Sequence, residues 1–350
     1  MKHFRFYSKQ DVLNITHLRR YETKLGEKLR TTDHEKDLAT QLAESSARYV
    51  LFGIPEDVGV RANHGKGGAD SAWIPFLKSF VNVQSCDRLT GDEIILLGHF
   101  DFSDIEQLID ANAKSYEERI DALRHAVSNI IDDEVEELSK LITAAGKVPI
   151  AIGGGHNNTY PLIKGSAKGW HKAGKIQKQR INAINVDAHA DSRISEGRHS
   201  GNGFRYAMEE SYLKKYAVVG LHENYNSQSM MDDLYSNLNI QYVSFEDIFI
   251  LEKLNFRQAV AQAFNFTDDE PVGIELDLDA LRETLSSAMS PTGITSIHAR
   301  QYMVFAGANQ NIAYVHIAEG ATKLDDGRED EQTGKLIAYL VTDFVKSAFS

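Results

Sequence analysis

The chain of 350 residues contains only one cysteine, Cys86, so it cannot form a disulfide bond within itself. It has six prolines and no Pro- or Ser-rich linker. No apolar run approaches the roughly 20 residues that a membrane-spanning helix needs. The first residues, "MKHFRFYSKQDV", lack the apolar stretch of a secretory signal. These absences indicate a reducing compartment, and we expect a cytoplasmic protein.

The chain as a whole is acidic. The 50 acidic residues outnumber the 38 basic ones, which gives a formal net charge of −12. Because binding to nucleic acid needs a basic face, this surplus disfavours nucleic acid as a partner. No membrane partner is expected either. We expect a small-molecule substrate, and an acidic protein can still hold a local basic pocket for an anionic one.

Eight short apolar runs are spaced along the chain, and they are continuous rather than alternating. Such runs are typical of strands buried on both faces of a parallel sheet. Helical periodicity lies between them, most clearly over 114–145 and also near 227–237, 246–265, 298–308 and 331–348. This alternation predicts a doubly wound α/β domain. The predicted strands are 49–53, 94–98, 148–152, 182–187, 216–221, 240–244, 272–279 and 312–318.

The first 45 residues are polar and charged, unlike the apolar periodic remainder. We predict that residues 1–45 form an N-terminal extension, which packs on a single domain over 46–350, and a role in subunit contacts stays open. The acidic run at 323–334 is expected to be a solvated loop before the last helix.

Three of the predicted strands end in side chains that bind metals well. The first is followed by "GGGH", whose glycines allow a tight turn and leave His156 at the strand tip. A glycine run before a helix can also hold phosphate, but the Lys-Ser/Thr ending of a P-loop is absent. This motif alone is therefore a weak indication of a metal site.

The other two strand ends carry ligand-type residues at every second position. In "DAHAD" these are Asp187, His189 and Asp191, and in "ELDLD" they are Asp277 and Asp279. If the strand stays extended, side chains two residues apart point to the same side. We therefore expect each motif to present its ligands as a one-sided platform.

Ligands of doubly wound sheets bind beyond the carboxyl ends of the strands, so these three motifs are expected to meet. Each such residue alone is ordinarily a cap, a turn residue or a satisfied core residue. Four clustered carboxylates, however, repel one another and lose solvation unless cations compensate. Carboxylates and imidazoles without a thiolate favour Mn²⁺ over structural zinc. Six ligands exceed what one four-coordinate ion needs, which indicates two ions roughly 3.5–4 Å apart.

In this order and spacing, "GGGH", "DAHADSR" and "ELDLDAL" resemble the three metal motifs of the ureohydrolases, which include arginase, agmatinase and formimidoylglutamase. The segment "GIPEDVGVRANHGKGGA" at 53–69 is similar to the first loop of that family. The resemblance implies an α/β fold of three layers, α/β/α, with a mostly parallel sheet of about eight strands (an arginase-like fold). It also implies two manganese ions per chain and hydrolysis of a C–N bond at an amidine or guanidine carbon.

The resemblance further implies roles for single residues. Asp191 matches the carboxylate that orients a bridging hydroxide in the family. Family members often form trimers or hexamers, so a homo-oligomer is expected. The implied metal ligands are His156, Asp187, His189, Asp191, Asp277 and Asp279.

Departures from the family pattern bear on the substrate. Arginases keep a histidine where this chain has Phe204, and the Phe-Arg pair formed with Arg205 resembles formimidoylglutamases and agmatinases. No acidic residue lies from 290 to 307, where we expect the guanidine enzymes to carry a carboxylate. A guanidinium without that partner loses its strongest bidentate contact, which disfavours arginase and agmatinase. Glu275 also replaces a serine of the family motif SxDxDxxDP.

N-formimino-L-glutamate fits these departures better, because its two carboxylates need cationic partners. We predict a binuclear manganese formimidoylglutamase, which releases L-glutamate and formamide in histidine breakdown. His199 and His222 are candidates for the acid that protonates the leaving nitrogen, although either can instead be structural. The predicted substrate-binding residues are Arg205, which is the first choice, Arg193, Arg61 and Asn202.

Other functions stay open. Another ureohydrolase would act on a guanidino compound, with Glu56, Glu275 or Glu319 supplying the missing carboxylate. A non-catalytic metal-binding protein would hold cations without turnover. A mononuclear zinc deacetylase of related topology would hold one ion, so counting metal ions per chain separates it from a binuclear enzyme.

Overall fold

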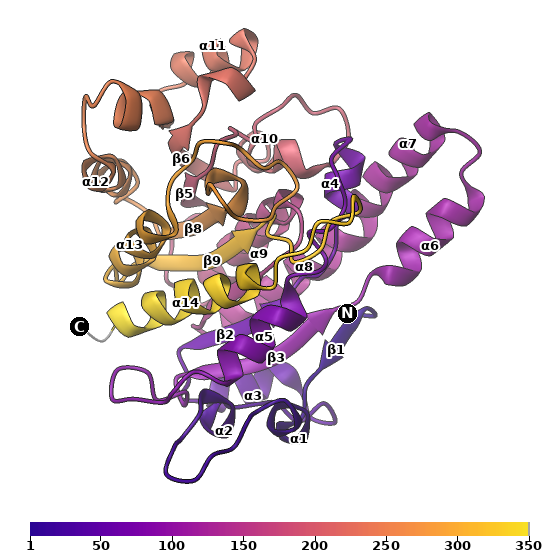
Figure 1. The fold of residues 1–350 in the computed structure, drawn as a ribbon, viewed down its shortest axis with the longest axis vertical. Coiled ribbons are helices and arrows are strands. Elements are labelled where there is room, and N and C mark those ends of the chain that lie inside the picture. Colours follow the sequence, from indigo (N-terminus) through magenta and orange to yellow (C-terminus); the bar gives the residue numbers. More distant parts are fainter. Residues whose placement is uncertain (349–350) are drawn as a thin grey trace.

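A nine-stranded sheet forms the middle layer of the computed structural model, which describes residues 1–348 (Figure 1). The strand order is β1-β3-β2-β4-β9-β8-β5-β6-β7, and every neighbouring pair is parallel except β1 with β3. All eight predicted strands are present, so the expected mostly parallel sheet is confirmed. The strands are β1 (Phe4–Phe6), β2 (Tyr49–Gly53), β3 (Ile94–Phe100), β4 (Val148–Ile152), β5 (Ile181–Val186), β6 (Leu213–Leu221), β7 (Ile240–Ser244), β8 (Val272–Asp277) and β9 (Ile312–Ala318).

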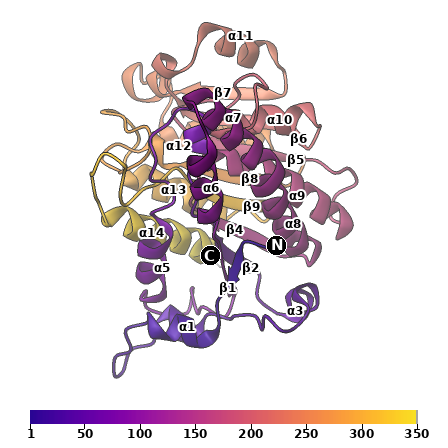
Figure 2. The same ribbon diagram turned by 90° about the vertical axis from the view of Figure 1, so that its right-hand side faces the viewer.

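Helices cover both faces of the sheet and complete the three layers (Figure 2). The helices are α1 (Lys9–Asn14), α2 (Leu25–Lys28), α3 (Leu38–Glu44), α4 (Val58–Ala62), α5 (Trp73–Val81), α6 (Ser103–Asn112), α7 (Tyr116–Ala126), α8 (Asp132–Ala144), α9 (Thr159–Lys172), α10 (Gly203–Glu209), α11 (Gln228–Ser236), α12 (Phe256–Phe266), α13 (Ser296–Gly307) and α14 (Gln332–Ser347). The pair α8 and α9 packs on one face, while α5, α13 and α14 cover the other. None of the helices described is long and apolar enough to cross a lipid bilayer.

The predicted helix over 114–145 is α7, a π-helical turn at Val127–Ile131 and α8 in succession. The prediction of one helix over 246–265 is wrong in its extent. The structure has two separate elements here: a π-helical turn at Glu246–Ile250, and then α12, which begins after Asn255. The Asn255 side chain accepts the backbone N–H of Gln258, whose side chain in turn accepts the Asn255 N–H. This capping box sets the start of the helix despite the continuing apolar periodicity.

Strand β1 is not predicted, because three residues cannot display a continuous apolar run. Phe4 lies opposite Phe100 of β3 in antiparallel register, and the two rings pack edge-on with centroids 4.9 Å apart. The N-terminal segment therefore contributes an edge strand to the main sheet before α1, α2 and α3. The boundary between an extension and a domain at residue 46 stays a prediction.

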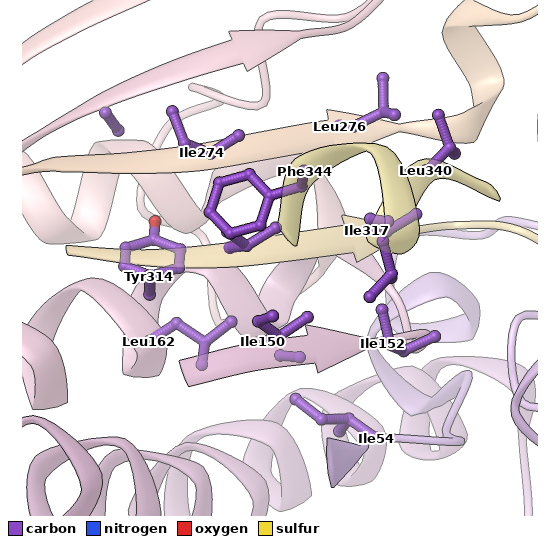
Figure 3. Packing of buried hydrophobic residues seen from close by; sticks show 14 of the residues in the cluster. Ile54, Ile150, Ile152, Leu162, Ile274, Leu276, Tyr314, Ile317, Leu340 and Phe344 are labelled. Carbon is purple, nitrogen blue, oxygen red and sulfur yellow. The ribbon is translucent and has the colours of Figure 1, made fainter. Parts of the chain in front are cut away.

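Apolar side chains from the sheet and from both helical layers form one large core (Figure 3). Ile150 of β4, Ile274 of β8 and Ile317 of β9 are fully buried there. Leu162 of α9 and Phe344 of α14 reach them from the helices. Both faces of the central strands are therefore covered by apolar groups, and the few polar residues inside them, such as Glu275 and His316, are buried.

Candidate metal centre

The carboxyl ends of β4, β8 and β5 lie close together, because only β9 separates β4 from β8, and β8 pairs directly with β5. After β4, Gly153 and Gly154 adopt φ angles of 84° and 77°, which side chains rarely tolerate. The turn leads to His156, the first residue of a short 3₁₀ turn before α9. The glycines thus bring the histidine to the edge of the sheet where the other two motifs end.

His156 is fully buried and faces three aspartates. Its Nδ1 lies 2.8 Å from Oδ2 of Asp191. The same nitrogen lies 3.2 Å from Oδ2 of Asp187 and 3.0 Å from Oδ2 of Asp277. Ligand atoms of these four residues lie within 4.8 Å of one another, and neither ring nitrogen of His156 has a well-formed hydrogen bond within the described chain. A fully buried imidazole whose Nδ1 faces three carboxylates fits a ligand of a divalent cation.

His189 forms the other side of the cluster. Its Nδ1 lies 3.5 Å from Oδ1 of Asp187 and 3.9 Å from Oδ2 of Asp279. Asp187 therefore faces His156 with one oxygen and His189 with the other. The structure brings all six predicted ligands together as two adjoining groups that share Asp187.

The route by which Asp187, His189 and Asp191 converge differs from the expected extended strand. Strand β5 ends at Val186, and the backbone N–H of His189 donates to Oδ1 of Asp187 at 2.7 Å. Asp191 adopts a φ of 42°, in the left-handed region that strains a residue with a side chain. The prediction of a continued strand is wrong, because the Asp187 carboxylate accepts the backbone N–H and turns the chain.

Charges in the cluster perturb one another strongly. Burial raises the pKa of Asp277 well above its ordinary value, and Asp187 and Asp279 raise it further. Burial alone would lower the pKa of His156, but the facing carboxylates, led by Asp187, raise it well above its ordinary value. Protons on the histidine therefore balance part of the negative charge. A bound cation would replace these protons, since metal ligands must be deprotonated.

A second buried network lies behind His156. Oε2 of Glu275 lies 3.4 Å from Nε2 of His156 and 2.7 Å from Nδ1 of His316. Burial alone would raise the pKa of Glu275, but the charges of His316 and His156 lower it to about 2. Sequence reasoning missed His316, because a single histidine inside the apolar strand β9 gives no pattern.

A cavity of about 550 Å³ opens beside the cluster. His156 and Asp187 are fully buried and do not line it. The remaining predicted ligands are reachable from this space, so a small molecule in the cavity can lie next to them. The predicted site residues that line it are His189, Asp191, Asp277, Asp279, Arg193 and Arg205.

Two predicted arginines thus face the cavity, and they differ in how firmly they are held. The side chain of Arg193 is 54% exposed, and its Nη2 lies 3.1 Å from Oε1 of Glu196. Arg205 donates to the carbonyl oxygen of Ser192 at 3.1 Å and to Oδ2 of Asp233 at 2.7 Å. Arg193 therefore has more freedom to turn toward an anionic ligand than Arg205.

Two other predicted substrate-binding residues do not line the cavity. Arg61 is held by Oδ1 of Asp57 and by Oδ2 of Asp325, each at 2.8 Å. Asn202 is fully buried and accepts a hydrogen bond from Nη1 of Arg198 at 2.9 Å. These partners occupy both side chains, which therefore tie loops together beside the site.

The candidate acids His199 and His222 also lie outside the cavity lining. The His199 side chain is fully buried, and its Nδ1 accepts the backbone N–H of Gly201. Burial, assisted by the charge of Arg124, lowers the pKa of His199 to about 4. The imidazole of His222 stacks on Phe245, with centroids 4.3 Å apart. Neither histidine therefore lines the cavity, and an acid role for either stays a prediction.

Glu319 lines the cavity and was assigned from sequence only as one of three carboxylates open to a guanidino substrate. Its Oε1 accepts the backbone N–H of His156 at 2.8 Å, and its Oε2 accepts the hydroxyl of Ser287 at 2.6 Å. Burial, and then the charge of Asp279, raises its pKa to about 8. Glu319 therefore reaches the cavity from outside the segment 290–307, but both of its oxygens already accept hydrogen bonds.

The sequence model of the Arginase family matches residues 47–346. The chain belongs to the arginase family. A formimidoylglutamase of Rhodococcus jostii is 25% identical over 302 residues, covering 84% of this chain and 85% of the relative. A formimidoylglutamase of Aromatoleum aromaticum is 27% identical over 311 residues, covering 85% and 82%.

Solved structures show the same fold. Formiminoglutamase of Trypanosoma cruzi, solved with Mn²⁺, aligns with a TM-score of 0.69 at 19% identity, covering 93% of this chain and 98% of that one. Formimidoylglutamase of Bacillus subtilis aligns with a TM-score of 0.70 at 18% identity, covering 95% and 94%. The arginase-like fold expected from the sequence is therefore confirmed.

Proposed function

We propose that this protein is a manganese-dependent hydrolase that converts N-formimino-L-glutamate and water to L-glutamate and formamide. The observation that carries the proposal is the meeting of two histidines and four aspartates beside a cavity that also presents arginines. The formimidoylglutamases of Rhodococcus and Aromatoleum, which match more than four-fifths of the chain, support the substrate.

The donor set supports two manganese ions per chain. One group consists of His156, Asp187, Asp191 and Asp277, whose ligand atoms lie within 4.8 Å of one another. The second consists of His189 and Asp279, together with the Asp187 that both groups share. Carboxylate oxygens and imidazole nitrogens without thiolates suit Mn²⁺. Manganese in the T. cruzi formiminoglutamase structure supports the same choice of ion.

When bound, the ions supply a water of lowered pKa and stabilise charge at the reacting carbon. Asp191 lines the cavity and lies against His156, so its carboxylate would accept a hydrogen bond from the attacking water and orient it. The oxygen of water is added to the formimino carbon and the bond from this carbon to the glutamate nitrogen breaks. Both protons of the water end on that nitrogen, so a cationic amidinium gives formamide and the ammonium of glutamate.

Glu319 is placed to hold the formimino end of the substrate. Its buried carboxylate lines the cavity beside Asp279, and an amidinium is a planar cation that pairs well with a carboxylate. Arg193 and Arg205, on the cavity lining, are the partners for the two substrate carboxylates. Arg193 is the better anchor of the two, since Asp233 and Ser192 already occupy Arg205.

The same Glu319 supports a second candidate, hydrolysis of a guanidino compound. A guanidinium presents the same planar, cationic donors as an amidinium, so the carboxylate alone does not discriminate between them. The arginines favour the amidine, because a substrate with two carboxylates needs two cationic partners.

A panel assay tests the proposal. The protein, loaded with Mn²⁺, is incubated with formiminoglutamate, arginine, agmatine and a guanidino acid, and products are identified by NMR. Formamide and glutamate in equal amounts are expected. Release of urea from a guanidine, without hydrolysis of formiminoglutamate, would refute the proposed substrate. Metal binding without turnover of any compound in the panel would refute the proposal that the protein is an enzyme. The trimer or hexamer expected from the family stays a prediction, which light scattering tests.

A further inference from the structure

A buried glutamate occupies the position directly behind His156. Glu275 of β8 is the register partner of His316 on β9, and both side chains are fully buried. Oε2 of Glu275 accepts the Nδ1–H of His316 at 2.7 Å and lies 3.4 Å from Nε2 of His156. Nδ1 of His156 points the opposite way, into the aspartate cluster. One imidazole therefore lies between the Glu275 carboxylate and the proposed metal ligands.

The other oxygen of Glu275 is fully engaged. Oε1 accepts the hydroxyl of Tyr314 at 2.6 Å and also the hydroxyl of Thr159. Tyr314 reaches it across Gly273, where a Cβ atom would collide with the tyrosine ring. An ionised carboxylate offers about four acceptor sites, and here each oxygen meets two groups. The carboxylate is thus fixed in position, with one side of Oε2 directed at His156.

His316 ties the same network to the glycine turn. Its Nε2 lies 3.3 Å from the carbonyl oxygen of Gly153, the residue that starts the turn leading to His156. The network therefore holds both the imidazole of His156 and the backbone that carries it.

We propose that Glu275 is a positioning residue for His156: its Oε2 accepts the Nε2 proton of the imidazole, so that the Nδ1 lone pair faces the aspartate cluster. Histidine ligands ordinarily need such an acceptor, which fixes the ring orientation and the tautomer. Buried glutamate is costly without partners, and His316, Tyr314 and Thr159 supply them. The inference rests on the proposed metal site and adds a residue that the six-ligand set does not contain.

The alternative is a separate cation site, because atoms of His156, Glu275 and His316 also lie within 4.8 Å of one another. Hydrogen bonds already engage Glu275 on both oxygens and His316 on Nδ1, so a cation there would have to displace these bonds. A count of bound ions separates the two possibilities.

The test compares Glu275→Gln with Tyr302→Phe. In Glu275→Gln the size is retained, but an amide N–H₂ can be presented to His156, which favours the wrong tautomer. Tyr302→Phe is the matched control, because it removes another buried hydroxyl of this core, one that donates to the carbonyl oxygen of Ile184 and not to Glu275. Mn²⁺ affinity is measured on metal-free proteins by the EPR signal of free Mn²⁺, and thermal melting checks the fold.

We expect Glu275→Gln to weaken binding of Mn²⁺ about 10- to 100-fold, and Tyr302→Phe to leave it unchanged while lowering the melting temperature. Glu275→Asp keeps the charge but withdraws it from His156, so the same loss is expected. This second variant decides the matter if Glu275→Gln fails to fold.

Unchanged Mn²⁺ affinity in the folded Glu275 variants would overturn the inference and leave the proposed function standing. Three ions in the wild type, with two in Glu275→Gln, would overturn it in favour of a cation site. Wild-type protein that binds no Mn²⁺ would instead overturn the proposed function, and the inference with it.

Discussion

Nδ1 of His156 lies 2.8 Å from Oδ2 of Asp191, although the two residues follow different strands and Asp191 must adopt a φ of 42° to make the approach. Backbone strain of this kind costs of order 1–3 kcal/mol and persists only where the surrounding structure enforces it. The strained backbone at Asp191 is therefore maintained by the surrounding structure, and it places the Asp191 carboxylate next to His156.

Replacing Asp277, one of the aspartates that face His156, should remove the metal. Asp277→Asn lowers the negative charge beside His156, and we expect loss of at least one Mn²⁺ per chain and of about 100-fold or more in turnover. Metal content by mass spectrometry and the rate of formamide release measure both. Asp343→Asn serves as the control, because it breaks only the ion pair between Asp343 of α14 and Arg300 of α13. Full metal content in Asp277→Asn would contradict the assignment.

Glu319→Gln should leave metal binding unchanged and reduce the efficiency of formiminoglutamate hydrolysis. At a pH above about 8, where Glu319 is ionised, the neutral amide keeps the size of the side chain but loses a charge-assisted hydrogen bond, worth about 1.5–3 kcal/mol. We expect kcat/KM for formiminoglutamate to fall about 10- to 100-fold at unchanged Mn²⁺ content. The two readouts come from steady-state kinetics and metal analysis of the same preparation. A loss of manganese in this variant would instead make Glu319 part of the metal site.

His199 should affect stability at low pH rather than catalysis. Its pKa is lowered from 6.5 to about 4 by burial, so the unfolded chain binds this proton before the folded one does. As pH falls from about 6.5 to 4, the wild type therefore loses up to about 3 kcal/mol of unfolding free energy through His199 alone. His199→Asn lacks this loss, so its stability deficit relative to wild type should narrow across that window in urea titrations. A pH–rate profile that changes in the variant would restore His199 as an acid.

Arg193→Ala should raise KM for formiminoglutamate, while Arg61→Ala should lower stability without a comparable effect on KM. Arg193 faces the cavity and is half-exposed, whereas Arg61 is held by Asp57 and Asp325. A lost contact to a charged group corresponds to about a 10-fold or greater rise in KM. Steady-state kinetics and thermal melting of both variants check the contrast. Equal KM effects in the two variants would contradict it.

The strands and the convergence of six ligand-type side chains could be predicted because their signals are local. Continuous apolar runs mark the strands, and dense carboxylates at their ends mark a site that only cations make stable. The turn after Val186 could not be predicted, because it depends on whether Asp187 accepts the N–H of His189 or lets the strand continue.

His316 escaped prediction for a different reason, and Glu319 was named only as one of three carboxylates open to a guanidino substrate. Each is a single polar residue in or after an apolar strand, and its partner is more than 30 positions away in the sequence. Their importance comes from strand order, since β9 lies between β4 and β8 and carries both residues past His156. Only the assembled sheet contains that information.

Strand β1 has a consequence for handling the protein. Its three residues pair with Gly98, His99 and Phe100 and so cover part of the long border of β3. An uncovered strand border offers free backbone donors and acceptors to other chains. Shortening or tagging the first few residues is therefore expected to yield a protein that precipitates on concentration, even with its reaction chemistry intact.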